Sequence, residues 1–130
     1  MAVAERLRAL IPSRTVYERE VPDGPLPARY FVVRGSLGDE SASRFGDQTD
    51  MVRESVWVTS VSRNDSPDVA AAEAEWASRK GREALRDYTP PLGRASFPMT
   101  SVQGQPVQRD DSLPAATVYA VEQYVVQYQL

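Results

Sequence analysis

Residues 51–88 carry the strongest local signals for the fold, because one clear strand pattern is followed there by one clear helix pattern. It reads MVRESVWVTSVS at 51–62 and SPDVAAAEAEWASRKGREALRDY at 66–88. The first part alternates between two faces and is dominated by β-branched and aromatic residues, which is typical of a strand. The second part opens with an N-cap serine, a proline and an acid. It predicts a helix from Ser66 to about Tyr88.

The predicted helix has an apolar stripe that should pack on a sheet. The stripe consists of Val69, Ala72, Trp76, Ala77, Ala84, Leu85 and Tyr88. Gly81 lies on the same stripe, where it costs about 1 kcal/mol relative to alanine, and a close approach of helix to sheet would offset that cost. Trp57 and Trp76 each fit the period of their own element, so both are predicted to lie in the core.

The N-terminal part predicts a short helix and two strands. Val3, Leu7, Leu10 and Ile11 form one face of a helix that ends at Pro12. A strand is predicted over 15–21 and a second over 29–34, joined as a hairpin across a turn rich in proline and glycine. The four consecutive apolar residues at 30–33 predict that the second strand is buried on both faces.

The C-terminal part predicts one weak strand and one long strand. Residues 92–114 are irregular, with a short strand near 97–102, and the long strand covers 116–130. The whole pattern predicts an α+β fold: a mostly antiparallel mixed sheet, with the N-terminal helix and the long helix packed on it. A chain of 130 residues fits one domain, so we expect a single domain over 1–130.

Composition excludes several kinds of chemistry. The sequence contains no cysteine and no histidine, which rules out disulfides, thiolate metal sites and catalysis by a serine or cysteine with histidine. The net charge of −3 disfavours broad binding to DNA phosphates. No apolar run is long enough for a membrane span, and the N-terminus does not resemble a signal peptide. We therefore expect a protein made in a cytoplasm, with no cofactor and no contact with a membrane.

Carboxylates are the remaining candidates for catalysis or metal binding. The adjacent pairs are Asp110-Asp111 and Asp39-Glu40. Neighbouring side chains in an extended segment point apart, and both pairs sit in polar sequence, so a solvated loop is the favoured interpretation. The acids around residues 39–50 lack the spacing of a calcium-binding loop. The sequence thus predicts binding and assembly rather than catalysis.

Two features stand out against an ordinary globular pattern. One is a polar segment at 35–50, predicted to be a flexible loop, whose acids are Asp39, Glu40, Asp47 and Asp50. The other is the final strand, which carries Tyr119, Tyr124 and Tyr128 and no charge after Glu122. Such a strand at a sheet edge would need cover from a neighbouring subunit. A central position within its own sheet is an equally good interpretation.

In the order of its elements and in several short sequence segments, the chain resembles the tail terminator (tail completion) proteins of tailed bacteriophages with long non-contractile tails. The resemblance spans nearly the whole chain. It rests on the N-terminal helix ending in Leu10-Ile11-Pro12, on Tyr30-Phe31-Val32-Val33, and on Val56-Trp57-Val58-Thr59-Ser60-Val61. It continues with the helix at 70–88, the proline-rich segment with Asp110-Asp111, and the strand at 118–128. The arginine-rich helix suits a host with a GC-rich genome.

The resemblance implies a structural role in the virion, at the head-proximal end of the tail. The protein would form a homo-oligomeric, hexameric ring that caps the tail tube, ends its polymerisation and joins the tail to the head connector. Its partners would be the tail tube protein and the head-closure protein. DNA would pass through the channel without specific binding, and the acids of the 35–50 loop would line it and repel the phosphates. Ejection kinetics of a variant with lysine at all four acids would test that hypothesis.

Three rival functions stay open at this point. One is another phage neck or minor tail component, such as a head-closure protein, which would also form a ring. A second is a small non-catalytic α+β domain that binds a ligand, which would need a sizeable apolar pocket. The third is an enzyme that uses carboxylates alone, and it is the least favoured.

Overall fold

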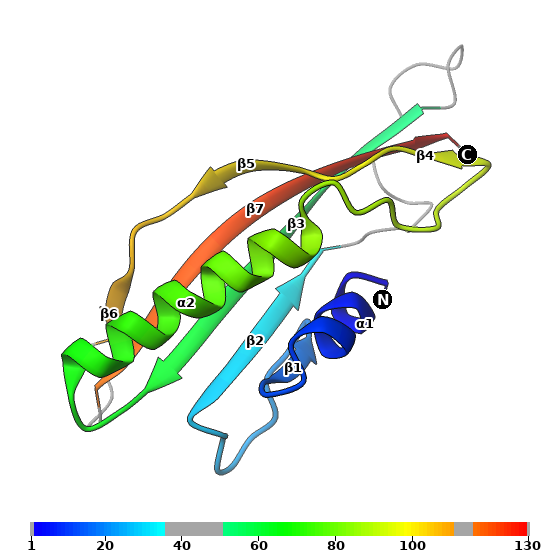
Figure 1. Ribbon diagram of the computed structural model, residues 1–130. Coiled ribbons are helices and arrows are strands. Elements are labelled where there is room, and N and C mark those ends of the chain that lie inside the picture. The colour runs from blue at the N-terminus through cyan, green and yellow to red at the C-terminus, as the bar shows by residue number, and fades with distance from the viewer. Residues whose placement is uncertain (1, 36–50, 111–115, 130) are drawn as a thin grey trace.

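The computed structural model describes residues 2–35, 51–110 and 116–129. Both helices lie on the same face of a seven-stranded sheet (Figure 1). The helices are α1 (Ala2–Leu10) and α2 (Pro67–Leu85). The strands are β1 (Thr15–Glu18), β2 (Arg29–Arg34), β3 (Met51–Arg63), β4 (Ala95–Ser96), β5 (Thr100–Gly104), β6 (Gln108–Asp110) and β7 (Thr117–Gln129). The predicted α+β class is confirmed.

The sheet is built around two long strands. Its order is β1-β2-β3-β7-β4, and β5 and β6 also pair with β7. β3 and β7 pair antiparallel over their whole lengths, from Met51 beside Gln129 to Arg63 beside Thr117. Every pairing is antiparallel except that of β1 with β2. The sheet is therefore mixed and mostly antiparallel, as predicted.

β1 and β2 do not form the predicted hairpin, because they run parallel, with Glu18 beside Val33. The strand predicted for 15–21 ends at Glu18. The next residue, Arg19, has a φ of 68°, in the left-handed region that turns the chain. The Arg19 N–H donates to the Val33 carbonyl at 2.8 Å, which fixes this turn against the end of β2. Residues 19–28 then carry the chain back to the start of β2.

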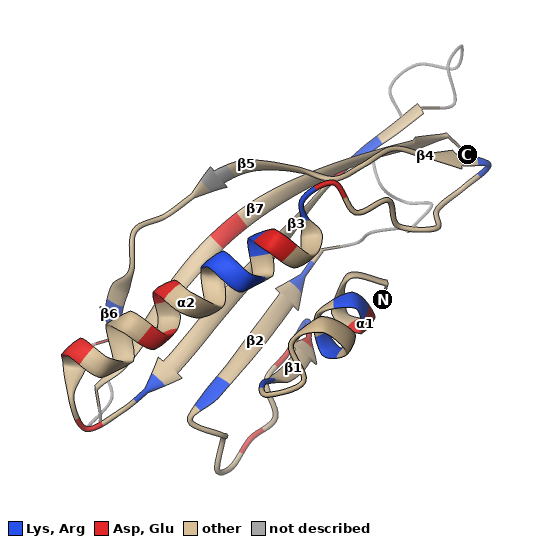
Figure 2. Cartoon of the chain, in the orientation of Figure 1, with Lys and Arg blue, Asp and Glu red and all other residues tan. Residues whose placement is uncertain are grey.

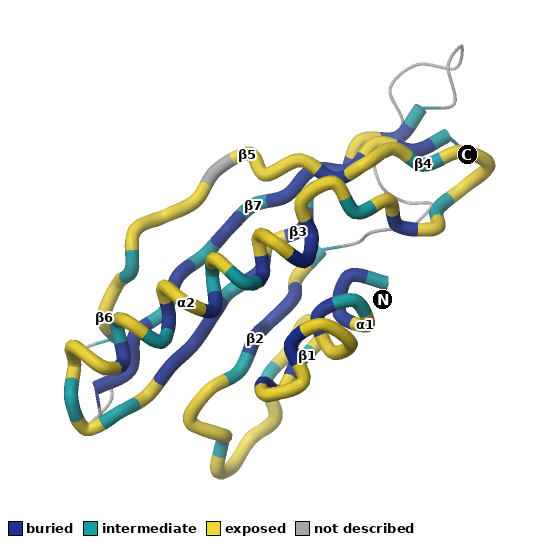
Figure 3. Tube along the Cα trace, viewed as in Figure 1, coloured by how far each residue is buried: buried dark blue, intermediate teal, exposed yellow. Residues whose placement is uncertain are grey.

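The hydrophobic core lies between the sheet and the two helices (Figure 3). The register places alternate residues of each strand on this face, with Val33 beside Val58 and Val56 beside Tyr124. The fully buried core side chains include Val3 and Leu7 of α1, Leu85 of α2, Phe31, Val33 and Val56 of the sheet, and Met99. The alternation predicted for the two long strands is confirmed.

α2 packs on the sheet through its small residues. Ser66 caps the helix as predicted, its side chain accepting from the Val69 N–H. The buried positions are Ala70, Ala74, Ala77, Gly81, Ala84 and Leu85. The predicted stripe is thus right for the second half of the helix and wrong for the first, where Val69 is 44% and Trp76 38% exposed. Alanine lets the helix lie close to the sheet, and this closeness leaves the larger side chains outside.

The segment after α2 forms more strand than predicted. Where the sequence indicates one weak strand near 97–102, the structure has β4, β5 and β6, all paired with β7. β5 shifts register between Ser101 and Gln103, which marks a bulge. These three short strands complete the sheet on the far side of β7.

Candidate interaction surfaces

The predicted acidic loop lies outside the described residues. Its acids, Asp39, Glu40, Asp47 and Asp50, follow the end of β2 and precede β3 in the sequence. Their proposed place in a channel stays a prediction. Asp111 of the second acidic pair is also outside the described residues, while Asp110 belongs to β6 and is half-buried.

β7 is not the edge strand that one of the two interpretations required. It pairs with β3 on one side and with β4, β5 and β6 on the other. Tyr124 and Tyr128 are 1% and 2% exposed and belong to the core. Tyr119 lies half-buried on the opposite face of the sheet, where its hydroxyl donates to the Gln108 side chain at 2.8 Å. A contact of these tyrosines with a second subunit stays a prediction, and Tyr119 is the one within reach of a neighbour.

The sheet face that points away from the helices is a second exposed surface. It carries Trp57, which is 43% exposed, so the predicted core position of this residue is wrong. The register places Trp57 between Arg34 on β2 and Gln123 on β7. Trp57, Gln105, Val121 and Gln123 line a shallow depression. Among the described residues, neither helix covers this face.

A buried ion pair joins α2 to the middle of the sheet. Glu122 of β7 is 3% exposed and accepts two hydrogen bonds from the Arg82 guanidinium. The bond from Arg82 Nε has a length of 3.2 Å. The hydroxyls of Ser78 and Ser101 also donate to this carboxylate, at 3.3 and 3.4 Å. The hydrogen bond to Glu122 raises the pKa of Arg82 above its usual range. A charge in the middle of an apolar strand face was the sequence signal for this pair.

Tyr124 adds a pH dependence to this cluster. Burial, followed by the negative charge of Glu122 and the hydrogen bond to it, raises the pKa of Tyr124 well above the ordinary 10. As the pH rises above about 10, the unfolded chain releases this proton first, so the free energy of unfolding falls. We expect Tyr124→Phe to remove this component, making the fall shallower by up to about 1.4 kcal/mol per pH unit. Urea denaturation between pH 9 and pH 11 would measure it.

The matched control for that experiment is Tyr119→Phe. Tyr119 is half-buried on the opposite face of the same strand, and this change also removes one tyrosine hydroxyl. Equal slopes for wild type and Tyr124→Phe would contradict the prediction.

The third surface is a groove along the first half of α2, here called the α2 groove. It has a volume of about 540 Å³. Its lining residues are Ser13, Arg14, Arg29, Asp68, Val69, Ala72, Glu73 and Trp76. The exposed side chains of Val69 and Trp76 give it apolar walls. The predicted core position of Trp76 is therefore wrong, and no other feature of the sequence indicated the groove.

Arg14 forms part of the floor of the α2 groove. Its guanidinium donates to the Val61 carbonyl at 3.0 Å, to the Ser62 hydroxyl at 2.8 Å and to the Glu73 carbonyl at 3.2 Å. Desolvation by burial lowers its pKa from 12.5 to about 10, against the opposing effect of the Glu73 carboxylate. Glu73 Oε1 accepts from Arg29 at 2.5 Å. Arg14 Nε and Glu73 Oε2 are both buried and have no hydrogen-bond partner.

No cluster of acids suited to a metal ion occurs in the part of the chain that the structure describes. In the same part, no helix combines the length and the apolar character needed to cross a membrane.

Solved structures share this fold, among them two that match nearly the whole chain. One is a chain in the virion of a native gene transfer agent particle, with a TM-score of 0.62 and 21% identity, over 98% of this chain and 92% of that chain. The other is a protein that carries no functional name, with a TM-score of 0.58 and 17% identity, over 99% of this chain and 90% of that chain. No protein-family model and no curated protein matches the sequence. At these identities the likeness shows the fold alone.

Proposed function

We propose that the chain is a structural protein of a phage or phage-like particle, and that it acts as the tail terminator. In this role a ring of copies, hexameric by the resemblance stated above, caps the head-proximal end of the tail tube and ends its polymerisation. The ring also joins the tail to the head connector, and DNA passes through it without specific binding. The protein would not be an enzyme.

The observation that carries this proposal is a fold shared over nearly its whole length with a chain of a gene transfer agent virion. Two further observations support it. The sheet exposes Trp57 on the face without helices, and the α2 groove exposes Val69 and Trp76 on the other side. Large apolar side chains on two separate faces suit a subunit that contacts neighbours on both sides.

The proposal is tested by light scattering after size-exclusion chromatography, with negative-stain images of the same peak. We expect six-fold rings with a central hole, because a terminator must match the symmetry of the tube that it caps. A monomer would call for a second step, in which purified tail tubes are added. Copies bound at one end of the tubes would support the proposal, and a monomer that does not bind the tube ends would contradict it.

A second candidate is a small non-catalytic ligand-binding domain, which the α2 groove favours. Its volume of about 540 Å³ lies within the usual range of ligand pockets, roughly 300–1,000 Å³. Melting temperatures that rise with an apolar ligand, in a protein that forms no assembly, would favour this function over the first.

A further inference from the structure

The α2 groove is an apolar surface without a partner in its own chain. α2 buries four of its six alanines and leaves Val69 and Trp76 on the groove walls, two turns apart. Isolated exposed apolar side chains are ordinary, but two large ones lining one concavity indicate a binding surface. The groove is therefore a candidate docking site, and the charge of its lining indicates what kind of occupant fits it.

The floor of the α2 groove contains two buried polar atoms without a hydrogen-bond partner. Arg14 Nε carries a hydrogen that no acceptor takes, and Glu73 Oε2 is an acceptor without a donor. The charged side chains of the lining are two arginines, Arg14 and Arg29, and two acids, Asp68 and Glu73, so the groove has no net charge. These features fit an apolar segment of protein better than a small ion.

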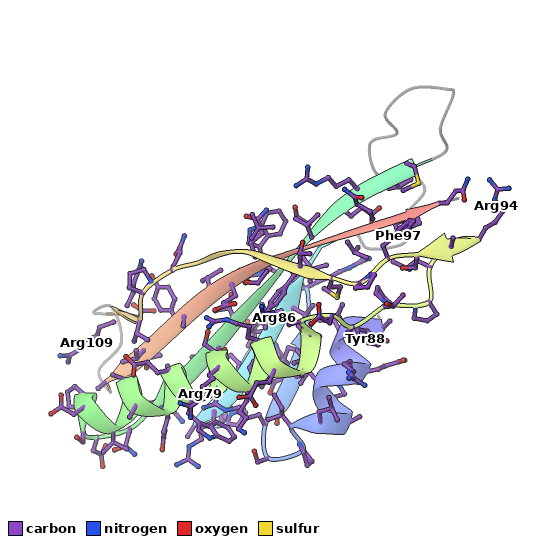
Figure 4. All side chains as sticks on the ribbon, turned by 45° about the horizontal axis from the view of Figure 1, so that its top comes forward. Arg79, Arg86, Tyr88, Arg94, Phe97 and Arg109 are labelled. Atoms are coloured by element: carbon purple, nitrogen blue, oxygen red, sulfur yellow. The ribbon has the colours of Figure 1, made fainter. Side chains whose placement is uncertain are left out.

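A suitable projection lies at the other end of the molecule. Phe97, between β4 and β5, is 47% exposed, and its N–H donates to the Gln127 carbonyl at 3.0 Å. The side chain of Met99, two residues later, is fully buried. The backbone bond at Phe97 and the buried Met99 together anchor this segment to the rest of the molecule. Figure 4 shows Phe97 and Arg94 at one end of the molecule and Arg109 at the other. Arg109 belongs to β6, at the end where α2 begins (Figure 1).

The position of Phe97 is fixed by the backbone of this corner. Gly93 has a φ of +57°, and a Cβ added there would lie 1.9 Å from the Gln129 carbonyl oxygen. The next residue, Arg94, donates its N–H to that same oxygen at 2.7 Å. An anchor on an already ordered backbone loses less conformational freedom on docking, which favours binding.

Charge along α2 favours contact between opposite ends of two copies (Figure 2). The first half of the helix holds Asp68, Glu73 and Glu75 and no cation. From residue 77 to residue 86 the cations are Arg79, Lys80, Arg82 and Arg86, against the single acid Glu83. The acidic half of α2 in one copy attracts the basic half of α2 in another, which favours a head-to-tail contact. Such a contact repeats from copy to copy and closes into a ring or extends into a filament.

We propose that Phe97 of one copy docks into the α2 groove of the next copy, between Val69 and Trp76. A phenylalanine buries roughly 150–250 Å², whereas a stable interface buries about 1,200–2,000 Å² in total. Phe97 is therefore the central anchor of a larger contact, which the charged sides of α2 extend. The docking deepens the proposed function and rests on it only for the closure of the contact into a ring.

The absence of cysteine allows a direct test by disulfide crosslinking. One variant carries Ala72→Cys on the groove wall, and another carries Pro98→Cys beside Phe97, so that Phe97, Val69 and Trp76 all stay in place. The two variants are mixed and oxidised mildly, and the mixed disulfide is identified by mass. Because a disulfide needs Cα atoms within about 7 Å, we expect at least ~10-fold more of this pair than of a control pair. The control replaces Pro98→Cys with Val102→Cys, at another exposed site, on β5.

A second variant tests whether the Phe97 side chain itself is needed for the crosslink, or whether the two segments only lie near each other. Phe97→Ser, placed in the Pro98→Cys chain, should return the crosslink to the level of the Val102→Cys control. Phe97 is exposed, so this change leaves the core intact. An unchanged crosslink in this variant would overturn the role of Phe97.

The outcomes distinguish the docking from the proposed function. Abundant crosslinks in open chains that never close and never cap tail tubes would support the docking and contradict the terminator role. Rings without an excess of the Ala72–Pro98 pair would support the role and overturn the docking. A cysteine at 72 that crosslinks only to tail tube protein would assign the groove to that partner and overturn the docking. Background crosslinking in the absence of any assembly would overturn both.

Discussion

Replacing Arg82 with methionine should lower the free energy of unfolding by about 3 kcal/mol at neutral pH, the lower end of the range for breaking a buried ion pair. Glu122 is 3% exposed, and Arg82 supplies its only charged partner among the described residues. Without Arg82, the carboxylate keeps only neutral donors, the hydroxyls of Ser78, Ser101 and Tyr124. Because the Arg82 side chain is itself 46% exposed, water can reach the site and limit the loss.

The matched control is Arg79→Met on the same helix. Arg79 is exposed and, within the described residues, takes part in no ion pair, so we expect a change within about 0.5 kcal/mol. Urea denaturation followed by circular dichroism measures both variants. A double-mutant cycle with Glu122→Gln isolates the coupling between the two side chains. Equal losses for Arg79→Met and Arg82→Met would contradict the assigned role of the pair.

Leu7→Ala should cost a similar amount, about 3 kcal/mol, within the 2.7–5.0 kcal/mol typical of buried leucines. Leu7 is fully buried and is the largest side chain through which α1 packs on the sheet. α1 has nine residues, and isolated helices shorter than about 12 residues are marginal in water. The helix therefore depends on this packing, and we expect its amides to exchange faster with solvent in the variant.

Leu10→Ala is the control in the same helix, because Leu10 is 51% exposed. Its free energy of unfolding should stay within about 0.5 kcal/mol of the wild type. Hydrogen exchange of α1 and urea denaturation together separate a local detachment of the helix from global destabilisation. A larger loss for Leu10→Ala than for Leu7→Ala would reverse the assigned faces of α1.

The strongest local signals in the sequence predicted the sheet and its main helix. Ser66 and Pro67 mark the start of α2, and the alternation in β3 and β7 correctly assigned residues to the two faces. The direction of β1 was not predictable in the same way. A short strand, a turn and a second strand have the same pattern in a hairpin and in a parallel pair. The difference depends on the left-handed turn at Arg19 and on its hydrogen bond to Val33, which only the folded chain contains.

The candidate surfaces were less predictable than the fold. Trp57 and Trp76 fit the period of their elements, but periodicity does not tell which face of a strand is covered or how close a helix lies to the sheet. Alanines take the inner positions of α2, so Trp76 remains on the groove wall. The groove floor joins Arg14 to Glu73, which are far apart in the sequence, so no local pattern could reveal it.

The pairing of β3 with β7 also governs how the chain reaches its fold. The two central strands are separated by all of α2 and the three short strands, so the sheet depends on contacts between distant parts of the sequence. Such topologies fold slowly, because a long loop must close, at a cost in entropy, before the strand pairing can stabilise the chain. Until residues 117–129 dock, β3 presents a free edge of thirteen residues with Val56 and Trp57 in its middle. We therefore expect newly made chains to be most prone to aggregation in this interval, and chaperone binding to be strongest then.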